Sequence, residues 1–318
     1  MQIFTNTNFN FLRWRWHAII LSLVVIAAGA WRVSTGGLTL GIDFSGGAAF
    51  VIQGASEAEI RRALDAMPGE KVIQQYDDPS KGQILVRLPQ AEDGSKLDAQ
   101  AQQVEQTLSA AGLKTTIVQR DLVSAVIGED LQQRGIYATL ASILAITAYI
   151  AVRFRPSFAV GAIAATLHDI LVTVAFLTFF KYDLSLNVVA ALLTITGYSV
   201  NDTIVVFDRV RENLRSMRRQ PLEEIVNISV NQTLARTVIT AGTTFLSVLS
   251  LFVFGGEALR GFAFTMLVGI VSGTYSTVFI ASAIAIILSH GRRRTASAAE
   301  PAPTAQDKGR KPRRARAS

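Results

Sequence analysis

The 318-residue sequence contains no cysteine, which excludes disulfide bonds and thiolate metal sites. Its three histidines, His17, His168 and His290, are too far apart in the sequence to indicate a local metal cluster. No Ser/His/Asp set and no phosphate-binding glycine loop is recognisable, so the sequence does not indicate an enzyme and no cofactor is expected. Charged residues are also scarce: they make up 17% of the chain, whereas soluble domains average about 25%.

Apolar residues are abundant. They make up 50% of the chain, and the mean hydropathy is +0.34. Six apolar stretches have close to the roughly 20 residues that a helix needs to cross the hydrocarbon core. They lie at 17–33, 136–152, 158–180, 186–207, 237–254 and 261–289. The sequence therefore predicts an α-helical polytopic membrane protein with six transmembrane helices.

The net charge of +7 is unevenly distributed, and arginine gathers next to particular spans. Arg13 and Arg15 precede the first span, and Arg153 and Arg155 lie between the second and the third. The fourth span is followed by Arg209, Arg211, Arg215, Arg218 and Arg219, and the sixth by Arg292, Arg293 and Arg294. The two short alternate loops contain only Lys181 and Arg260 as basic residues. The positive-inside rule then predicts that both termini are cytoplasmic. This pattern concerns topology and does not indicate a nucleic-acid partner.

The first apolar stretch allows two interpretations. Its basic flank, apolar run and small residues Ala28, Gly29 and Ala30 resemble a cleavable signal peptide. The run is long for a signal, however, and Trp31 and Arg32 follow the small residues directly. We therefore expect the stretch to be retained as a membrane anchor.

The chain divides into four predicted parts: 1–35, the N-terminus and first span; 36–130, an external domain; 131–290, the other five spans; and 291–318, a disordered basic tail. The external part alternates between strand and helix patterns. Strands are predicted at 48–53, 71–76, 83–88 and 114–119, and helices at 56–67 and 96–111. This β-α-β-β-α-β order is typical of a ferredoxin-like α+β domain.

A glycine-rich segment joins the first span to the external domain. Gly41, Gly46 and Gly47 permit positive φ angles and close backbone approach, which suits either a simple turn or a defined joint on which the domain pivots. Asp43, between these glycines, is expected to cap local backbone N–H groups.

Asp202 is an ionisable residue within the fourth span, where a charge costs about 2.5–3.5 kcal/mol even on the lenient insertion scale. Arg236 begins the next span, which starts from the same side of the membrane, so the two residues can lie at similar depth. Two interpretations remain open: a static ion pair that fixes helix packing, or a protonatable carboxylate in a proton relay. Asn201 lies beside Asp202 and is a supporting candidate.

Further polar residues occur inside the spans. Thr240 and Thr243 belong to a row of hydroxyls that follows Arg236, which suits either helix–helix hydrogen bonds or a path of hydroxyls and waters. His168 and Asp169 interrupt the third span. Because successive helix residues point about 100° apart, we expect that they cannot both serve one small site, and that Asp169 faces the bundle.

Four motifs resemble those of the SecF family, the smaller partner in the SecD/SecF protein-export accessory and a relative of the resistance–nodulation–division transporters. They are GIDFSGG from Gly41, HD at His168, GYSVNDTIVVFDRVREN from Gly197 and NQTLART from Asn231, and the resemblance covers about residues 12–290. It implies that the proton-linked aspartate is Asp202 and that its arginine partner is Arg236. It also implies a bacterial cytoplasmic membrane location, and as partners SecD, the SecYEG translocon with YajC and YidC, the exported preprotein and membrane lipids.

Three functions are consistent with the sequence. The resemblance implies that the proton gradient helps to draw polypeptide out of the channel. A stand-alone exporter of small molecules or lipids is the second possibility, although such exporters usually carry two halves of this kind. The third is a passive scaffold subunit of the translocase, which would not need Asp202 to change its charge.

Overall fold

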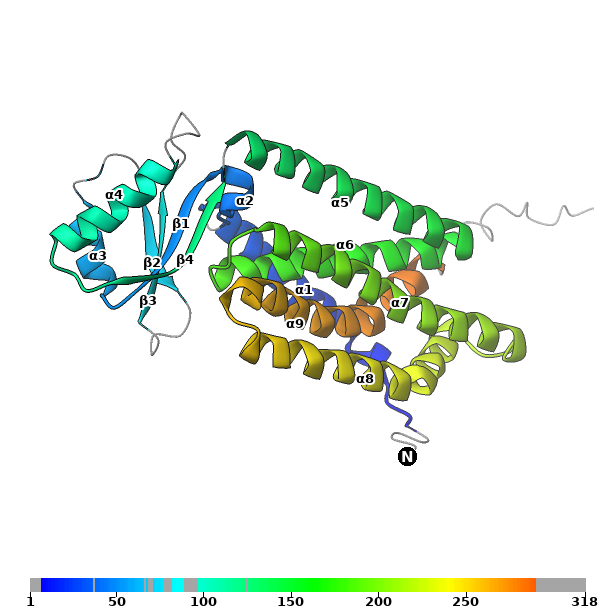
Figure 1. Ribbon diagram of the computed structural model, residues 1–318. Helices are drawn as coiled ribbons and strands as arrows, with labels where there is room; N and C mark the ends of the chain where they lie inside the picture. Colours follow the sequence, from blue (N-terminus) through cyan, green and yellow to red (C-terminus); the bar gives the residue numbers. More distant parts are fainter. Residues whose placement is uncertain are drawn as a thin grey trace, which may run out of the picture.

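The computed structural model describes residues 7–36, 38–65, 67, 71–76, 82–88, 97–123 and 125–289. The basic tail predicted at 291–318 lies outside these residues. Figure 1 shows a bundle of long helices with a small α+β domain at one end. The predicted fold class, six membrane-spanning helices and one α+β domain between the first and second, is confirmed.

Six helical segments are long and apolar enough to cross a membrane. The first consists of the 3₁₀ turn η1 (Phe11–Trp14) and α1 (Arg15–Ser34), and the last of α9 (Glu257–Ser276), a π-helical segment η4 (Thr277–Ala281) and a final stretch to Ser289. The four others are α5 (Ala125–Arg153), α6 (Pro156–Phe179), α7 (Leu186–Ser216) and α8 (Leu222–Phe254).

Helices α7 and α8 are longer than the apolar stretches that predicted them. With 31 and 33 residues at 1.5 Å each, they measure about 46 and 50 Å, whereas the hydrocarbon core is about 30 Å thick. Both therefore extend beyond the membrane at the arginine-rich end of the bundle, where they form a projecting hairpin (Figure 1). The residues from Leu222 to Arg236, which precede the fifth apolar stretch, belong to α8 itself.

The α+β domain has the predicted element order. Its elements are β1 (Gly47–Gln53), α3 (Glu57–Leu64), β2 (Val72–Tyr76), β3 (Gln83–Leu88), α4 (Leu97–Ala110) and β4 (Thr116–Val123). The four strands pair antiparallel in the order β2-β3-β1-β4. In Figure 1, α3 and α4 lie on the side of the sheet that faces away from the bundle. Between sheet and helices lies a core that contains Phe50, Ile52, Ile60, Val86 and Leu108, each at most 1% exposed.

Helix α3 begins with a capping box. The Glu59 N–H donates to the Ser56 hydroxyl, and the Ser56 N–H donates in return to the Glu59 carboxylate at 2.8 Å. The Ser56 N–H and, second, its hydroxyl stabilise the charged carboxylate and so lower the pKa of Glu59. Because the folded-state pKa is the lower one, the capping contribution is complete above the ordinary glutamate pKa and disappears as the pH falls through the folded-state value.

Small residues let the membrane helices approach closely. A Cβ added at Gly29 of α1 would lie 2.2 Å from the Ala175 Cβ of α6, so Gly29 has a packing role. On α9, a Cβ at Gly269 would lie 2.2 Å from the Ile195 Cδ1 of α7, and one at Gly273 would lie 2.9 Å from the Ser199 Cβ. The small-xxx-small pattern of the last span thus brings α9 against α7.

The α+β domain is joined to the N-terminal end of α7 by several contacts. Short helix α2 (Ile42–Ser45) is followed by Gly46 and Gly47, whose φ angles are 69° and 116°. The Asp43 carboxylate accepts the N–H of Leu186 at 2.8 Å, so it caps the first residue of α7 and not a local amide as expected. The Gly41 N–H donates to the Leu184 carbonyl at 2.8 Å, and Arg87 of β3 forms an ion pair with Asp183. The joint therefore holds the N-terminus of α7.

Candidate functional site

Asp202 lies within the bundle on α7 and is only half satisfied. Its Oδ1 accepts a hydrogen bond from the Thr237 hydroxyl of α8 at 2.8 Å. Its Oδ2 is buried and has no hydrogen-bond partner among the described residues. A buried polar atom without a partner is rare in proteins and calls for a reason such as strain, chemistry or an absent partner. Asp202 is therefore a candidate for a group that changes partner or protonation state.

Arg236 lies at the depth that the sequence predicted, but it does not pair with Asp202 in this structure. Fourteen residues separate Asp202 from Ser216 at the end of α7, and fourteen separate Leu222 at the start of α8 from Arg236. Among the described residues, no carboxylate lies within ion-pair distance of Arg236, whose side chain is exposed. The next residue, Thr237, donates the hydrogen bond that the Asp202 carboxylate accepts.

The hydroxyls after Arg236 form an uncovered row. Residues Arg236, Thr240, Thr243, Ser247 and Ser250 recur at alternating intervals of four and three, and all five are exposed; we call them the polar stripe. Its hydroxyls donate to carbonyls of α8 itself, for example Thr240 to the Arg236 carbonyl at 2.9 Å. Asn201 on α7 is exposed as well. Among the described residues, the side chains of the stripe thus form no hydrogen bond or ion pair with another helix.

Asp169 on α6 is the opposite case, a buried carboxylate with every acceptor position used. It is 1% exposed. Its Oδ1 accepts from the Ser272 hydroxyl at 2.7 Å and lies 3.0 Å from Nδ1 of His168, while its Oδ2 accepts from Ser199 at 2.5 Å and from Ser276 at 2.7 Å. One carboxylate therefore connects α6, α7 and α9.

The expectation that His168 and Asp169 could not serve one site was wrong. The His168 ring bends back far enough for Nδ1 to reach its neighbour's carboxylate, because a side chain can cover the 100° between successive helix positions. Its Nε2 lies 2.8 Å from the Ser22 hydroxyl of α1. The Tyr275 hydroxyl lies 3.3 Å from the same serine and donates to the Ala18 carbonyl. The network thus extends from α6, α7 and α9 to α1.

Sequence reasoning missed the partners of both carboxylates. The sequence pattern singles out Thr240 and Thr243 among the hydroxyls after Arg236, but not Thr237, and it assigns no role to Ser272 and Ser276. The available signal was their spacing: Ser272 and Ser276 are one helical turn apart on the face that carries Gly269 and Gly273. Hydroxyls on a close-packing face meet whatever polar group the neighbouring helix presents.

These features define a class: a polytopic helical membrane protein with two carboxylates inside its bundle, of which Asp169 is fully hydrogen-bonded and Asp202 is not. Comparison with known proteins gives the family. Residues 103–291 match the family described as "Protein export membrane protein SecD/SecF, C-terminal". The chain belongs to this protein-export family, in its SecF branch.

Two individual relatives and one solved structure support this family assignment. The protein translocase subunit SecF of Rhodothermus marinus is 42% identical and is matched over 94% of this chain and 100% of its own length. The protein translocase subunit SecDF of Thermus thermophilus is 37% identical over 90% of this chain, which corresponds to 39% of that longer protein. The crystal structure of Thermus SecDF, a translocon-associated membrane protein, superposes with a TM-score of 0.80 at 35% identity and covers 91% of this chain and 40% of its own.

Proposed function

We propose that this chain is the SecF subunit of a bacterial translocase that uses the proton gradient to assist polypeptide export, and that Asp202 takes up and releases the proton. The observation that carries the proposal is the half-satisfied carboxylate beside an uncovered polar stripe that begins with Arg236. Ionisable residues in membrane helices are expensive, face a partner or a water-filled path, and mark relays. Asp169, which has no free acceptor position, fits a structural role.

Two charge states of Asp202 would favour two arrangements. Deprotonated, the carboxylate is stabilised by moving next to the Arg236 guanidinium; protonated, it loses that attraction and its Oδ2 needs no cation. The group therefore biases the position of α7 against α8, as a two-state switch requires. The joint at Asp43 and Leu186 holds the outer end of the same helix, sixteen residues or about 24 Å away. Motion of α7 can thus reach the α+β domain directly.

The uncovered stripe supports a partner subunit. In lipid, exposed arginine and hydroxyl side chains are unfavourable unless another helix or water satisfies them. Thermus SecDF combines the segment similar to this chain with additional sequence in one protein. We propose that SecD covers the polar stripe here. SecYEG, YajC, YidC and the preprotein are further partners that the family resemblance suggests.

Cysteine cross-linking tests this contact, and the absence of native cysteine makes every introduced thiol unique within the chain. Ser247→Cys on the polar stripe is expected to cross-link to SecD in native membranes. Val152→Cys on α5, whose side chain is 90% exposed, is the matched control and should not. Equal cross-linking at both positions, or cross-linking at neither, argues against SecD as the partner of the stripe and favours the stand-alone exporter.

We also propose that the arginine-rich end of the bundle, with both termini, is cytoplasmic, and that the α+β domain is external, because of the distribution of arginine. An impermeant thiol reagent added outside should label Ser109→Cys, an exposed position on α4, within the time that it labels a known external thiol. Ser216→Cys at the end of α7 should react only after the membrane is opened. The reverse labelling pattern would overturn the orientation.

A further inference from the structure

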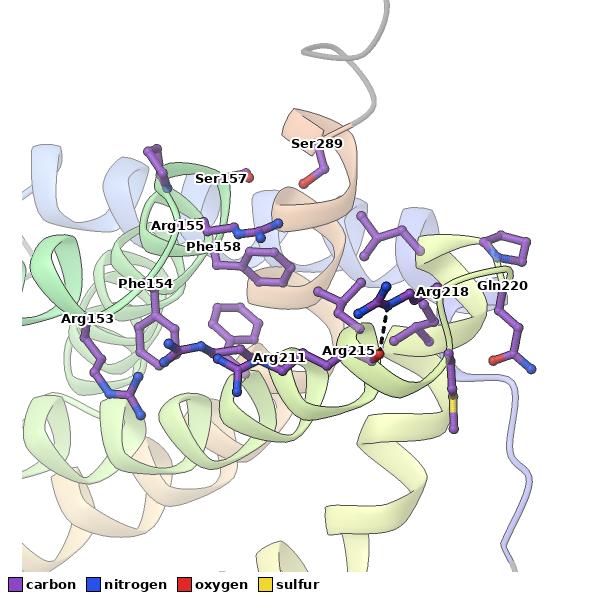
Figure 2. Close-up of a pocket in the computed structure, with 17 residues that line it drawn as sticks. Arg153, Phe154, Arg155, Ser157, Phe158, Arg211, Arg215, Arg218, Gln220 and Ser289 are labelled. Atoms are coloured by element: carbon purple, nitrogen blue, oxygen red, sulfur yellow. Dashed lines mark hydrogen bonds between the residues drawn. The ribbon is translucent and has the colours of Figure 1, made fainter.

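A cavity of about 850 Å³ lies at the arginine-rich end of the bundle (Figure 2). It is enclosed by the α5–α6 connection, the last turns of α7, the first turns of α8 and Ser289 at the end of the last helix. Among the described residues, no carboxylate lines the cavity. Five arginines do: Arg153, Arg155, Arg211, Arg215 and Arg218. Neither the proton site nor the joint includes this cavity.

Most of this positive charge is uncompensated. The Nη2 of Arg153 lies 2.7 and 2.9 Å from the two carboxylate oxygens of Asp208. The other four arginines form no ion pair with a carboxylate of the described residues, and Arg218 donates only to the Arg215 carbonyl at 3.3 Å. Four guanidinium groups around one cavity raise its electrostatic potential, so the cavity favours an anion.

The floor of the cavity is apolar. Phe158 and Phe207 lie edge to face with their ring centres 5.1 Å apart and are 7% and 1% exposed, and Ile225 is 2% exposed. Close in sequence to the lining residues Arg153 and Phe158, Val152 of α5 and Val160 of α6 are 90% and 48% exposed. A ligand with both an anionic head and an apolar chain matches this combination, whereas a small inorganic anion would use only the arginines.

The cavity also lies at the depth of lipid headgroups. Helix α6 has 24 residues and measures about 36 Å, slightly more than the hydrocarbon core of about 30 Å, so its N-terminus at Pro156 lies at the membrane boundary. Arg153 and Arg155 immediately precede it. Basic pockets between transmembrane helices at this level bind anionic lipid headgroups.

We propose that this cavity binds the phosphate headgroup of an anionic phospholipid. The planar guanidinium groups of Arg155, Arg211 and Arg215 donate to the phosphate oxygens, for which arginine geometry is well suited. The acyl chains lie along the outward apolar surface of α5 and α6. Such a lipid connects the α5–α6 loop to the projecting part of α7, the helix that carries Asp202, and so stabilises one position of that helix.

The test measures retention of phosphatidylglycerol by the purified full-length protein, alone and in its native complex, using native mass spectrometry and vesicles with and without this lipid. The double variant Arg211→Gln/Arg215→Gln is expected to weaken phosphatidylglycerol binding by about tenfold or more, since each basic residue near the headgroup contributes on the order of 1 kcal/mol. The double variant Arg13→Gln/Arg219→Gln is the matched control, because it removes the same charge from exposed positions outside the cavity. This control variant should change phosphatidylglycerol binding by less than about twofold, because salt screens exposed charges that lie outside the site.

Three results would overturn the proposal. Equal loss in both double variants would mean that only bulk charge attracts the lipid. Displacement of phosphatidylglycerol by inorganic phosphate at comparable concentration would mean a site for a free anion. Retention of a polyglutamate peptide without retention of phosphatidylglycerol would mean a site for an acidic polypeptide segment. Phe158→Leu, which keeps the charge and shortens the apolar floor, should weaken lipid binding but leave phosphate binding unchanged.

Discussion

Asp202→Asn is expected to abolish the part of polypeptide export that depends on the proton gradient, while the protein still assembles with SecD. Asparagine keeps the shape of the side chain and an acceptor for the Thr237 hydroxyl, but it can neither release a proton nor attract Arg236. Export into inverted membrane vesicles, measured with and without a gradient, should show the same rate for the variant under both conditions. Its free energy of unfolding should remain within about 1 kcal/mol of the wild type, because the hydrogen bond from Thr237 is kept and no cavity is created.

Two further variants make this prediction sharper. Arg236→Lys keeps the positive charge but loses the planar fork, so it should also lose most of the gradient-dependent export. Thr194→Val on α7 is the matched control of similar volume, because Thr194 is exposed, bonds only to the Ala190 carbonyl of its own helix and lies outside the polar stripe; it should keep the gradient-dependent export. If Asp202→Asn assembled normally and still responded to the gradient like the wild type, Asp202 would be part of a static contact and the scaffold function would be favoured.

Asp169→Leu is expected to have the largest effect on stability. The carboxylate accepts from three serines and lies next to His168, and its removal leaves these groups without their common partner in the interior of the bundle. Hydrogen bonds between membrane helices average about 0.6 kcal/mol and reach about 1.7, so the loss of three such bonds predicts a destabilisation of about 2–4 kcal/mol. Unfolding by a denaturing detergent, followed by helix content, measures this difference.

The matched control is Asp130→Leu, which makes the same substitution on the exposed part of α5. Asp130 pairs only with Arg134 one turn away, and such surface pairs contribute about 0.3–0.5 kcal/mol. Asp169→Asn, which keeps one carbonyl oxygen, should fall between the wild type and Asp169→Leu. Equal unfolding profiles for Asp169→Leu and Asp130→Leu would show that the network does not hold the helices together.

The fold was predictable because its signals are local. Apolar length indicated the spans, and period-two and period-3.6 patterns gave the α+β order. Ser56 and Glu59 have the spacing of a capping box, and the structure contains this box at the start of α3. The lengths of α7 and α8 were underestimated because a helix continues past the membrane as long as its backbone bonds are satisfied, whatever the hydropathy. Hydropathy indicates which part of a helix lies in the hydrocarbon core, and it does not indicate where the helix ends.

The site was predictable in part. The presence of Asp202 and Arg236 at similar depth followed from their positions near the ends of two consecutive spans. The contact between Thr237 and Asp202, and the four-helix network around Asp169, depend on how the helices are rotated about their axes, and this rotation is set by packing at positions such as Gly269 and Gly273. A sequence shows which residues share one face of a helix, but it does not show which faces of two neighbouring helices pack together.

Coupling between the charge of Asp202 and the joint that holds the α+β domain is tested directly by one distance measurement. Spin labels at Ser109→Cys on α4 and Lys181→Cys on the loop after α6 report the position of the domain relative to the bundle in the complex with SecD. The account predicts two distance populations in the wild type whose ratio changes with pH, and a single population in Asp202→Asn that pH does not alter. A pH-dependent shift of equal size in Asp202→Asn would contradict the coupling, because the domain would then move without any change in the charge of this carboxylate.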